Sequence, residues 1–339
     1  MAERMSNLIE SGPSAGSVAT DGGQLVEPER RGAGAPGGAP TVSIGLPVFN
    51  GEAYLERAIR SILDQDFTDF ELIVVDNAST DATGQIARRY AAADPRVRYH
   101  RNPENIGAAR NFTLALELAR GRYFKWAAYD DWLEPTFLRR CVEVLEREPD
   151  VTLVFPSTNV WDESGNLITR YRHPSDIMSR RPERRFFHAL WNWKYQTGIF
   201  GVVRTDALRA ARPMEGYKGA DRVLFAEMVL AGGVRELDEY LFNSTEAVSV
   251  RKGRGHAWWT GRPADRPTFD RWRLLGNYLA LVARAPQFGP LDRVRSGAAV
   301  LLFFCRSWPR RALYDELVAG ARHAWRRLAP APVAARVAR

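Results

Sequence analysis

Four residues, Leu72 to Val75, constrain the fold more than any other part of this chain, because they form a continuous apolar run that ends at Asp76. Continuous rather than alternating apolarity is typical of a parallel strand that is covered on both faces. A second apolar run begins near Thr41 and ends in an Asn-Gly pair, which predicts a strand followed by a turn. Between the two runs, apolar residues recur at the spacing of one helix face: Leu55, Ala58, Ile59, Ile62 and Leu63. The segment therefore predicts a strand, a helix and a second, parallel strand.

The same alternation continues through the next part of the chain. We expect strands at "RVRYH", "RYFKWAA" and "VTLVFPS". Helices are expected over Thr83 to Ala92, over Ala108 to Ala119 with Gly121 as the C-cap, and after Pro135 at a helix start. Strands that alternate with helices predict an α/β fold, a doubly wound mixed sheet flanked by helices.

The two ends of the chain differ from this pattern. The segment 1–40 is rich in Gly, Ala, Pro and Ser, which predicts disorder. We place the α/β domain at 41–250, and its last part is expected to contain a hairpin at Ser164–Asn166 and a helix over "GADRVLFAEMVLAGG". The extension 251–339 is expected to be helical and Arg-rich.

Charge excludes one class of function. The net charge is +8, and residues 301–339 carry eight arginines against two acids, so they hold +6 of it. The rest of the protein is nearly neutral, which argues against a nucleic-acid-binding domain. No apolar stretch is long enough to span a membrane. The two cysteines, Cys141 and Cys305, lie in apolar helical patterns that are typical of buried thiols. We therefore expect a cytoplasmic protein.

Two adjacent carboxylates, Asp130 and Asp131, follow the apolar strand "RYFKWAA". Like charges side by side repel unless one takes a proton or a cation lies between them. A hard divalent cation that also carries phosphate oxygens satisfies this requirement. The carboxyl ends of strands are where ligands bind in doubly wound sheets, so Asp76 and this pair mark a candidate site.

Four motifs in order resemble the family 2 glycosyltransferases, which have a GT-A fold. They are "LPVFN", "VVDNASTD", "NIGAARN" and "AYDD", and the resemblance covers about Val42 to Glu246. The family implies a nucleotide-sugar donor, a divalent metal (Mg²⁺ or Mn²⁺), and transfer to an acceptor hydroxyl with inversion. The acceptor would be a sugar, a lipid-linked molecule or another small molecule.

The resemblance also implies roles for individual residues. Asp76 would accept a hydrogen bond from the base, with Asn77 beside it, and Arg110 would lie near the donor. Asp130 would bind the metal, with Asp131 as a second ligand. The remaining donor-side residues form the first nucleotide-facing turn: Pro47, Phe49 and Glu52.

On the acceptor side, the resemblance makes Asp221 the catalytic base, since an acceptor hydroxyl needs a carboxylate to take its proton. Asp221 also suits the N-cap of its helix. Three aromatic residues, Trp191, Trp193 and Tyr195, are candidates for stacking on an acceptor sugar, although aromatic residues commonly belong to a core.

The sequence departs from the family pattern at three positions. Ala128 replaces the first aspartate of the D-x-D motif, Asn77 replaces an aspartate, and Thr245 or a neighbour stands where many relatives have a metal-binding histidine. Two of them, Ala128 and Thr245, stand at positions where the family pattern has residues that bind the metal.

Three alternatives stay open. A nucleotidyltransferase shares this fold shape, but it needs a basic, Gly-rich loop after the first strand, and "LPVFNGEAYL" has none. The second alternative is a protein of the same fold that binds a nucleotide sugar but has no catalytic activity. Third, the basic stretch Ala312 to Leu328 suits either peripheral contact with the inner face of a membrane or packing on the catalytic domain.

Overall fold

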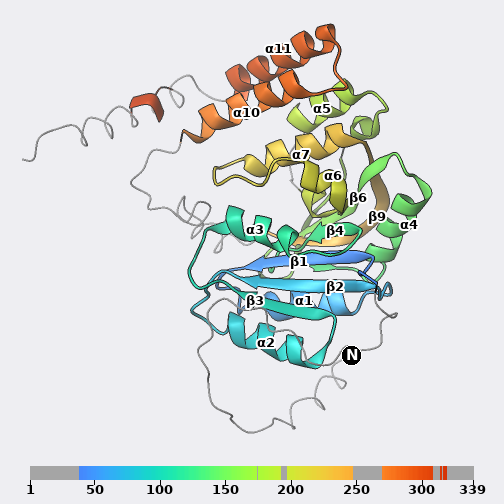
Figure 1. Ribbon diagram of the computed structural model, residues 1–339, viewed down its shortest axis with the longest axis vertical. Coiled ribbons are helices and arrows are strands. Elements are labelled where there is room, and N and C mark those ends of the chain that lie inside the picture. Colours follow the sequence, from blue (N-terminus) through green and yellow to red (C-terminus); the bar gives the residue numbers. More distant parts are fainter. Residues whose placement is uncertain are drawn as a thin grey trace, which may run out of the picture.

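The structure, a computed structural model, describes residues 38–173, 175–191, 197–246, 269–307, 314 and 316–318. The segment 1–40, which is expected to be disordered, and the basic stretch Ala312 to Leu328 therefore fall almost wholly outside the described residues. Figure 1 shows a central sheet with helices on both sides and a helical hairpin at one end of the molecule.

The strands form one mixed sheet in the order β3-β2-β1-β4-β8-β6-β9-β5, with β7 paired to β6. Strands β1 to β4 are parallel, β8 is antiparallel to both of its neighbours, and β9 runs parallel to β6. The strands are β1 (Val42–Val48), β2 (Phe70–Asp76), β3 (Val97–Arg101), β4 (Tyr123–Trp126), β5 (Trp132–Leu133), β6 (Val151–Trp161), β7 (Leu167–Tyr171), β8 (Val202–Arg204) and β9 (Gly233–Thr245).

The helices cover both faces of this sheet, as the alternation of the sequence predicts. They are α1 (Leu55–Leu63), α2 (Thr83–Ala93), α3 (Ala108–Glu117), α4 (Phe137–Arg147), α5 (Pro182–Trp191), α6 (Thr205–Ala210), α7 (Ala220–Ala231), α10 (Asp270–Arg284) and α11 (Pro290–Ser307), with short 3₁₀ turns η1 (Ser175–Met178) and η2 (Thr197–Phe200).

Strand β2 shows why its apolar run is continuous. Leu72 and Val74 belong to the core under α1, α2 and α4, whereas Ile73 and Val75 belong to the core under α3, α5 and α7. Successive side chains of a strand point to opposite faces, so a strand between two helical layers needs apolar residues at every position. All four residues have no exposed surface.

The hairpin of α10 and α11 extends the second of these cores. Leu274 and Tyr278 of α10, and Phe304 of α11, are buried in the same cluster as α5 and α7. The hairpin therefore packs on the α/β body through its own apolar side chains.

Three local predictions were wrong in detail. The helix before Gly121 ends earlier, at Glu117 with Leu118 as its C-cap. Gly121 is needed because a Cβ there would lie 2.5 Å from the Ser43 nitrogen. Pro135 precedes the N-cap of α4, which is Thr136. Cys305 is exposed, while Cys141 is buried as predicted.

Candidate active site

The carboxyl ends of β1, β2 and β4 form one edge of the sheet. Val48 pairs with Asp76 and Gly45 pairs with Trp126, so the segments that follow these strands emerge side by side. They surround a pocket of about 110 Å³. Its lining comprises Pro47, Val48, Phe49, Asn77, Asn105, Ala108, Asn111, Phe112, Ala128, Tyr129, Asp130 and Phe200. Four residues predicted from the sequence thus meet in one place: Pro47, Phe49, Asn77 and Asp130.

A network of side-chain amides shapes one wall of the pocket. The Asn77 amide donates to Asn105 Oδ1 at 2.8 Å, and its oxygen accepts from Asn102 Nδ2 at 3.0 Å. Asn102 also donates to Asn111 Oδ1 at 2.8 Å, and Asn111 donates to the Val75 carbonyl at 2.8 Å. The network joins β2, the loop before α3 and α3 itself without any formal charge. Two of its residues, Asn105 and Asn111, stand in the "NIGAARN" motif, but the motif alone does not indicate that they join Asn77 and Asn102 in one network.

Asp76 lies behind the pocket rather than on its surface. Its side chain is fully buried, and Oδ1 accepts a hydrogen bond from the Ser79 nitrogen at 2.8 Å. Oδ2 accepts from the Tyr99 hydroxyl at 2.7 Å and from Arg101 Nη1 at 2.6 Å. The carboxylate therefore fixes the turn after β2 and the end of β3.

The Asp130–Asp131 turn is held from two sides. Arg57 Nη2 of α1 donates to the Asp130 carbonyl oxygen at 2.7 Å, and the Thr245 hydroxyl donates to the same oxygen at 2.6 Å. The Thr245 nitrogen donates to Asp131 Oδ1 at 2.9 Å. Thr245 thus fixes the turn through both its backbone nitrogen and its hydroxyl.

The two aspartates fit a divalent cation by their chemistry. Both are largely buried, with 6% and 7% exposure. Burial and the charge of Asp130 raise the pKa of Asp131, so a cation beside the pair would relieve an existing cost. Mg²⁺ commonly takes one or two carboxylates together with substrate phosphates. Across the described residues, no group of three or more His, Cys, Asp and Glu side chains is placed to hold a metal ion.

Lys125 is a buried charge that the sequence reasoning passed over. Its ammonium nitrogen donates to the Phe200 carbonyl at 2.6 Å and to the Trp126 carbonyl at 3.0 Å. Burial lowers its pKa to about 7, with Asp131 opposing the shift. Lys125 thereby ties η2, which carries the pocket residue Phe200, to the strand that precedes Asp130.

Two further donor-side candidates are placed outside the pocket lining. Glu52 Oε2 accepts a hydrogen bond from the Ala82 nitrogen at 2.9 Å, so Glu52 anchors the start of α2. Arg110, on α3, pairs with Glu117 at 2.7 Å, and both side chains are about half exposed.

The acceptor-side candidates lie farther along the chain. Asp221 is in the first turn of α7, whose N-cap is Gly219, so the predicted N-cap role of Asp221 is wrong. The Asp221 side chain is partly accessible, and burial raises its pKa. Trp191 stacks on Phe187 and meets the edge of Phe303 of α11 at 5.6 Å between ring centroids. Trp193 and Tyr195 lie outside the described residues.

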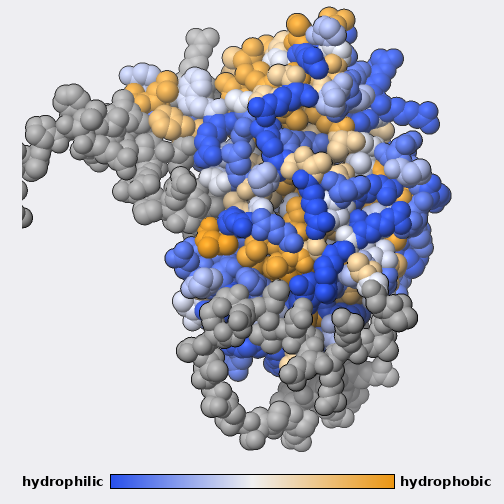
Figure 2. Space-filling view, viewed as in Figure 1, coloured by the Kyte–Doolittle hydropathy of each residue, from blue (hydrophilic) through white to orange (hydrophobic). Residues whose placement is uncertain are grey.

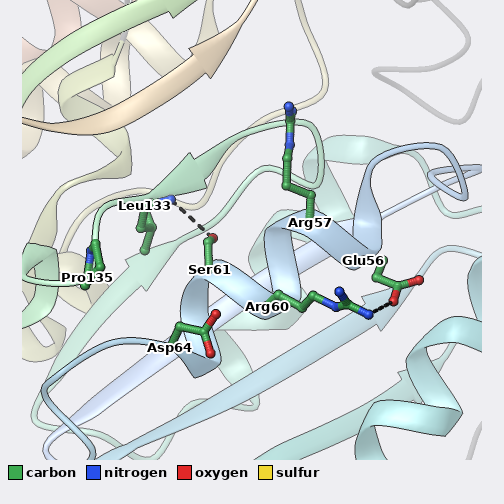
Figure 3. Close-up of a pocket in the computed structure, with 7 residues that line it drawn as sticks. All are labelled: Glu56, Arg57, Arg60, Ser61, Asp64, Leu133 and Pro135. Atoms are coloured by element: carbon green, nitrogen blue, oxygen red, sulfur yellow. Dashed lines mark hydrogen bonds and ion pairs between the residues drawn. The ribbon is translucent and has the colours of Figure 1, made fainter. Parts of the chain in front are cut away.

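A larger hollow, of about 470 Å³, lies beside α1 and β5. Figure 3 shows that Arg57 points away from Glu56 and Arg60, which pair with each other at 2.6 Å. None of the site residues predicted from the sequence lines this hollow. We therefore place the candidate site at the smaller pocket, on the strand ends.

The structure is that of an α/β protein with its candidate pocket at the carboxyl edge of parallel strands, where nucleotide ligands commonly bind. The family model described as glycosyl transferase family 2 matches residues 43–211, which include every residue of the pocket lining. This chain belongs to glycosyltransferase family 2.

Among curated proteins, the chondroitin synthase of Escherichia coli is 35% identical over 229 residues, which are 63% of this chain and 33% of that protein. Glycosyltransferase GlyA of Streptococcus pneumoniae serotype 4 is 25% identical over 235 residues, 65% of this chain and 32% of that protein. The chain thus spans about a third of the length of these two relatives.

Among solved structures, S. aureus TarS (residues 1–349) superposes with a TM-score of 0.58 at 18% identity, over 78% of this chain and 71% of that one. At this identity the likeness shows the fold alone. It confirms the predicted mixed α/β fold of the GT-A type.

Proposed function

We propose that this protein transfers a sugar from a nucleotide-sugar donor to an acceptor hydroxyl, with inversion at the sugar carbon. One observation carries the proposal: Pro47, Phe49, Asn77 and Asp130 line a single pocket inside the segment that matches the family. Structures of S. aureus TarS in complex with UDP and with UDP-GlcNAc support a nucleotide sugar as the donor class.

In this proposal the base lies against the amide wall. Asn77 is the polar group that meets the base edge, because Asp76 has no exposed surface. Phe49 and Tyr129 provide aromatic surface, and aromatic rings stack on flat heterocycles. Glu52 and Arg110 do not line the pocket, and we assign both to the outer part of the donor site, where Glu52 holds the start of α2.

The diphosphate lies at the other end of the pocket, by Asp130. Asp130 and Asp131 would hold a divalent cation, Mg²⁺ or Mn²⁺. When bound, such a cation neutralises negative charge on the leaving diphosphate. The chain's own contribution is to fix the turn, since Arg57 and Thr245 both bind the Asp130 carbonyl.

Asp221 is the proposed catalytic base. A carboxylate can take the proton of the acceptor hydroxyl while the bond to the sugar breaks. Burial raises the pKa of Asp221, and a higher pKa makes a carboxylate a stronger base. The relationship to a chondroitin synthase favours a polysaccharide or glycoconjugate acceptor.

The proposal is tested by incubating the full chain with UDP-, dTDP- and GDP-sugars in Mg²⁺ and measuring nucleoside diphosphate release, with and without oligosaccharide acceptors. A transferase releases the diphosphate from at least one donor, faster with an acceptor. A nucleotidyltransferase would instead release pyrophosphate from a nucleoside triphosphate. Binding of a nucleotide sugar without release of the nucleoside diphosphate would indicate a binding protein without catalytic activity.

A further inference from the structure

Helix α11 has a second apolar face, which no described part of the chain covers. Its inner face is buried against the body through Val300, Phe303 and Phe304. On the opposite side, six residues at helical spacing are all exposed: Leu291, Val294, Ala298, Leu301, Leu302 and Cys305. We call these six residues the outer stripe. In an ordinary surface helix, this side would be polar.

The exposure of the outer stripe is large. The exposed fractions are 58% for Leu291, 69% for Val294, 49% for Leu301 and 63% for Leu302. Scattered apolar residues are normal on a surface, but a contiguous set along one helix marks an interaction site. Figure 2 shows apolar residues gathered at the end of the molecule that α10 and α11 form.

Basic side chains accompany the outer stripe. Arg295 and Arg306 are exposed and follow it along one side of the helix. Helix α11 contains three arginines and one aspartate, a net charge of 3 − 1 = +2. A basic helix with one exposed apolar face is the form that lies in the interface of an anionic bilayer.

The position of α11 also suits a flat partner. The hairpin lies at one end of the long axis of the molecule, so its outer side can meet a surface without obstruction by the sheet (Figure 1). Within the described part of the chain, no helix is long and apolar enough to cross a membrane. A second copy of this chain fits less well, because two arginine-lined stripes would bring like charges together.

We propose that α11 docks the protein on an anionic lipid surface, lying in the plane of the surface with the outer stripe among the lipids. The inference goes beyond the proposed transfer reaction and does not depend on it. It uses residues that the pocket does not, and it concerns α11 rather than the stretch after residue 311.

The test is co-sedimentation of the full chain with vesicles of phosphatidylcholine alone and of phosphatidylcholine mixed with phosphatidylglycerol. The key variant is Leu301→Gln with Leu302→Gln, which keeps size and helix propensity. The matched control is Leu167→Gln with Ile168→Gln on β7, two exposed apolar neighbours with 41% and 49% exposure. Circular dichroism checks that both variants fold.

We expect binding to the mixed vesicles, little binding to the neutral ones, and reversal by salt. Loss of two leucines from the interface should weaken binding at least about tenfold, and the control should bind as the wild type does. Three results would overturn the proposal: no binding of wild type to anionic vesicles, equal binding by the α11 variant, or equal loss in the β7 control. Self-association that only the α11 variant loses, without vesicle binding, would assign the stripe to a second copy instead.

Discussion

Arg57 Nη2 lies 2.7 Å from the carbonyl oxygen of Asp130, so a helix at the start of the domain holds the turn that carries the site's carboxylates. The same nitrogen donates to the Thr245 hydroxyl at 2.9 Å, and the guanidinium lies 4.0 Å from the Trp132 ring centroid. Three segments far apart in the sequence thus meet at one guanidinium.

Replacing Arg57 should therefore disturb the proposed donor site without removing a carboxylate that would bind the cation. In Arg57→Gln, the Asp130 turn loses one of its two side-chain donors, and supporting residues of this kind typically change affinity or activity about 10–100-fold. We expect donor binding, measured by titration calorimetry, to weaken in that range. Arg60→Gln is the control, because Arg60 on the same helix makes an exposed ion pair with Glu56. Equal effects in both variants would contradict a specific role for Arg57.

Lys125 should make stability depend on pH above neutrality. Its folded-state pKa of about 7 lies below the ordinary value of 10.5. Between these values the unfolded chain binds more protons than the folded one, so the free energy of unfolding rises with pH, by up to about 1.4 kcal/mol per pH unit. Urea unfolding across pH 7 to 10.5 measures this slope. Lys125→Met should lose it, and an unchanged slope in that variant would show that other groups cause the dependence.

At the opposite edge of the sheet, Glu71 should stabilise the fold most strongly near neutral pH. It accepts from Ser43 at 2.6 Å, from Arg98 at 2.7 Å and from Arg120. Burial alone would raise its pKa, but these bonds outweigh burial and hold the pKa below 4.5. Its contribution is therefore present above about pH 4.5 and lost as the pH falls through the folded-state pKa.

In Glu71→Gln, the partner arginines lose their buried counter-charge, so the free energy of unfolding at pH 7 should drop by about 3 kcal/mol. Urea unfolding at pH 7 and in acid should show the gap between wild type and variant shrink below pH 4.5. A gap that stays constant with pH would mean that the lost packing, and not the charge, accounts for the drop.

The sequence predicted most of the fold because burial leaves a periodic trace. The apolar run of β2 and the spacing of α1 are direct consequences of a sheet between helical layers, and both elements lie where the sequence placed them. The pocket was predicted in part for the same reason: strand ends locate Asn77 and Asp130.

The remaining contacts left no such trace. Arg57 on an exposed helix surface is indistinguishable from a solvated arginine, and its partner Thr245 is 188 residues away. Lys125 is a charged residue within the expected strand "RYFKWAA", and its neighbours in the sequence do not reveal that the structure buries it completely. The burial of Asp76 depends on Tyr99 and Arg101, which belong to a different strand. Such contacts are fixed by tertiary packing and become visible only when the strands are assembled.

A substitution at Asp221 tests its role as the base, because the N-cap of its helix is Gly219 and is left unchanged. Asp221→Asn should fold and bind donor nearly normally, and should turn over at least about 10²-fold more slowly, since general-base catalysis contributes 10²–10⁴-fold. Asp206→Asn is a matched control, an aspartate at the second position of α6. Steady-state rates of nucleotide release give the comparison. Near-normal turnover would place the base elsewhere, and a parallel loss of donor binding would make Asp221 a donor-site residue.

The most direct test of the proposed donor site is thermal unfolding of wild type and Asp130→Ala with nucleotide sugars and Mg²⁺ or Mn²⁺. Asp64→Ala, in the larger hollow beside α1, is the control. A donor at about 100 times its Kd should add about 2.7 kcal/mol to the stability of wild type. We predict this stabilisation in wild type and Asp64→Ala, and its loss in Asp130→Ala or after metal removal with EDTA. Equal stabilisation of Asp130→Ala, or no stabilisation of wild type by any nucleotide sugar, would contradict the account.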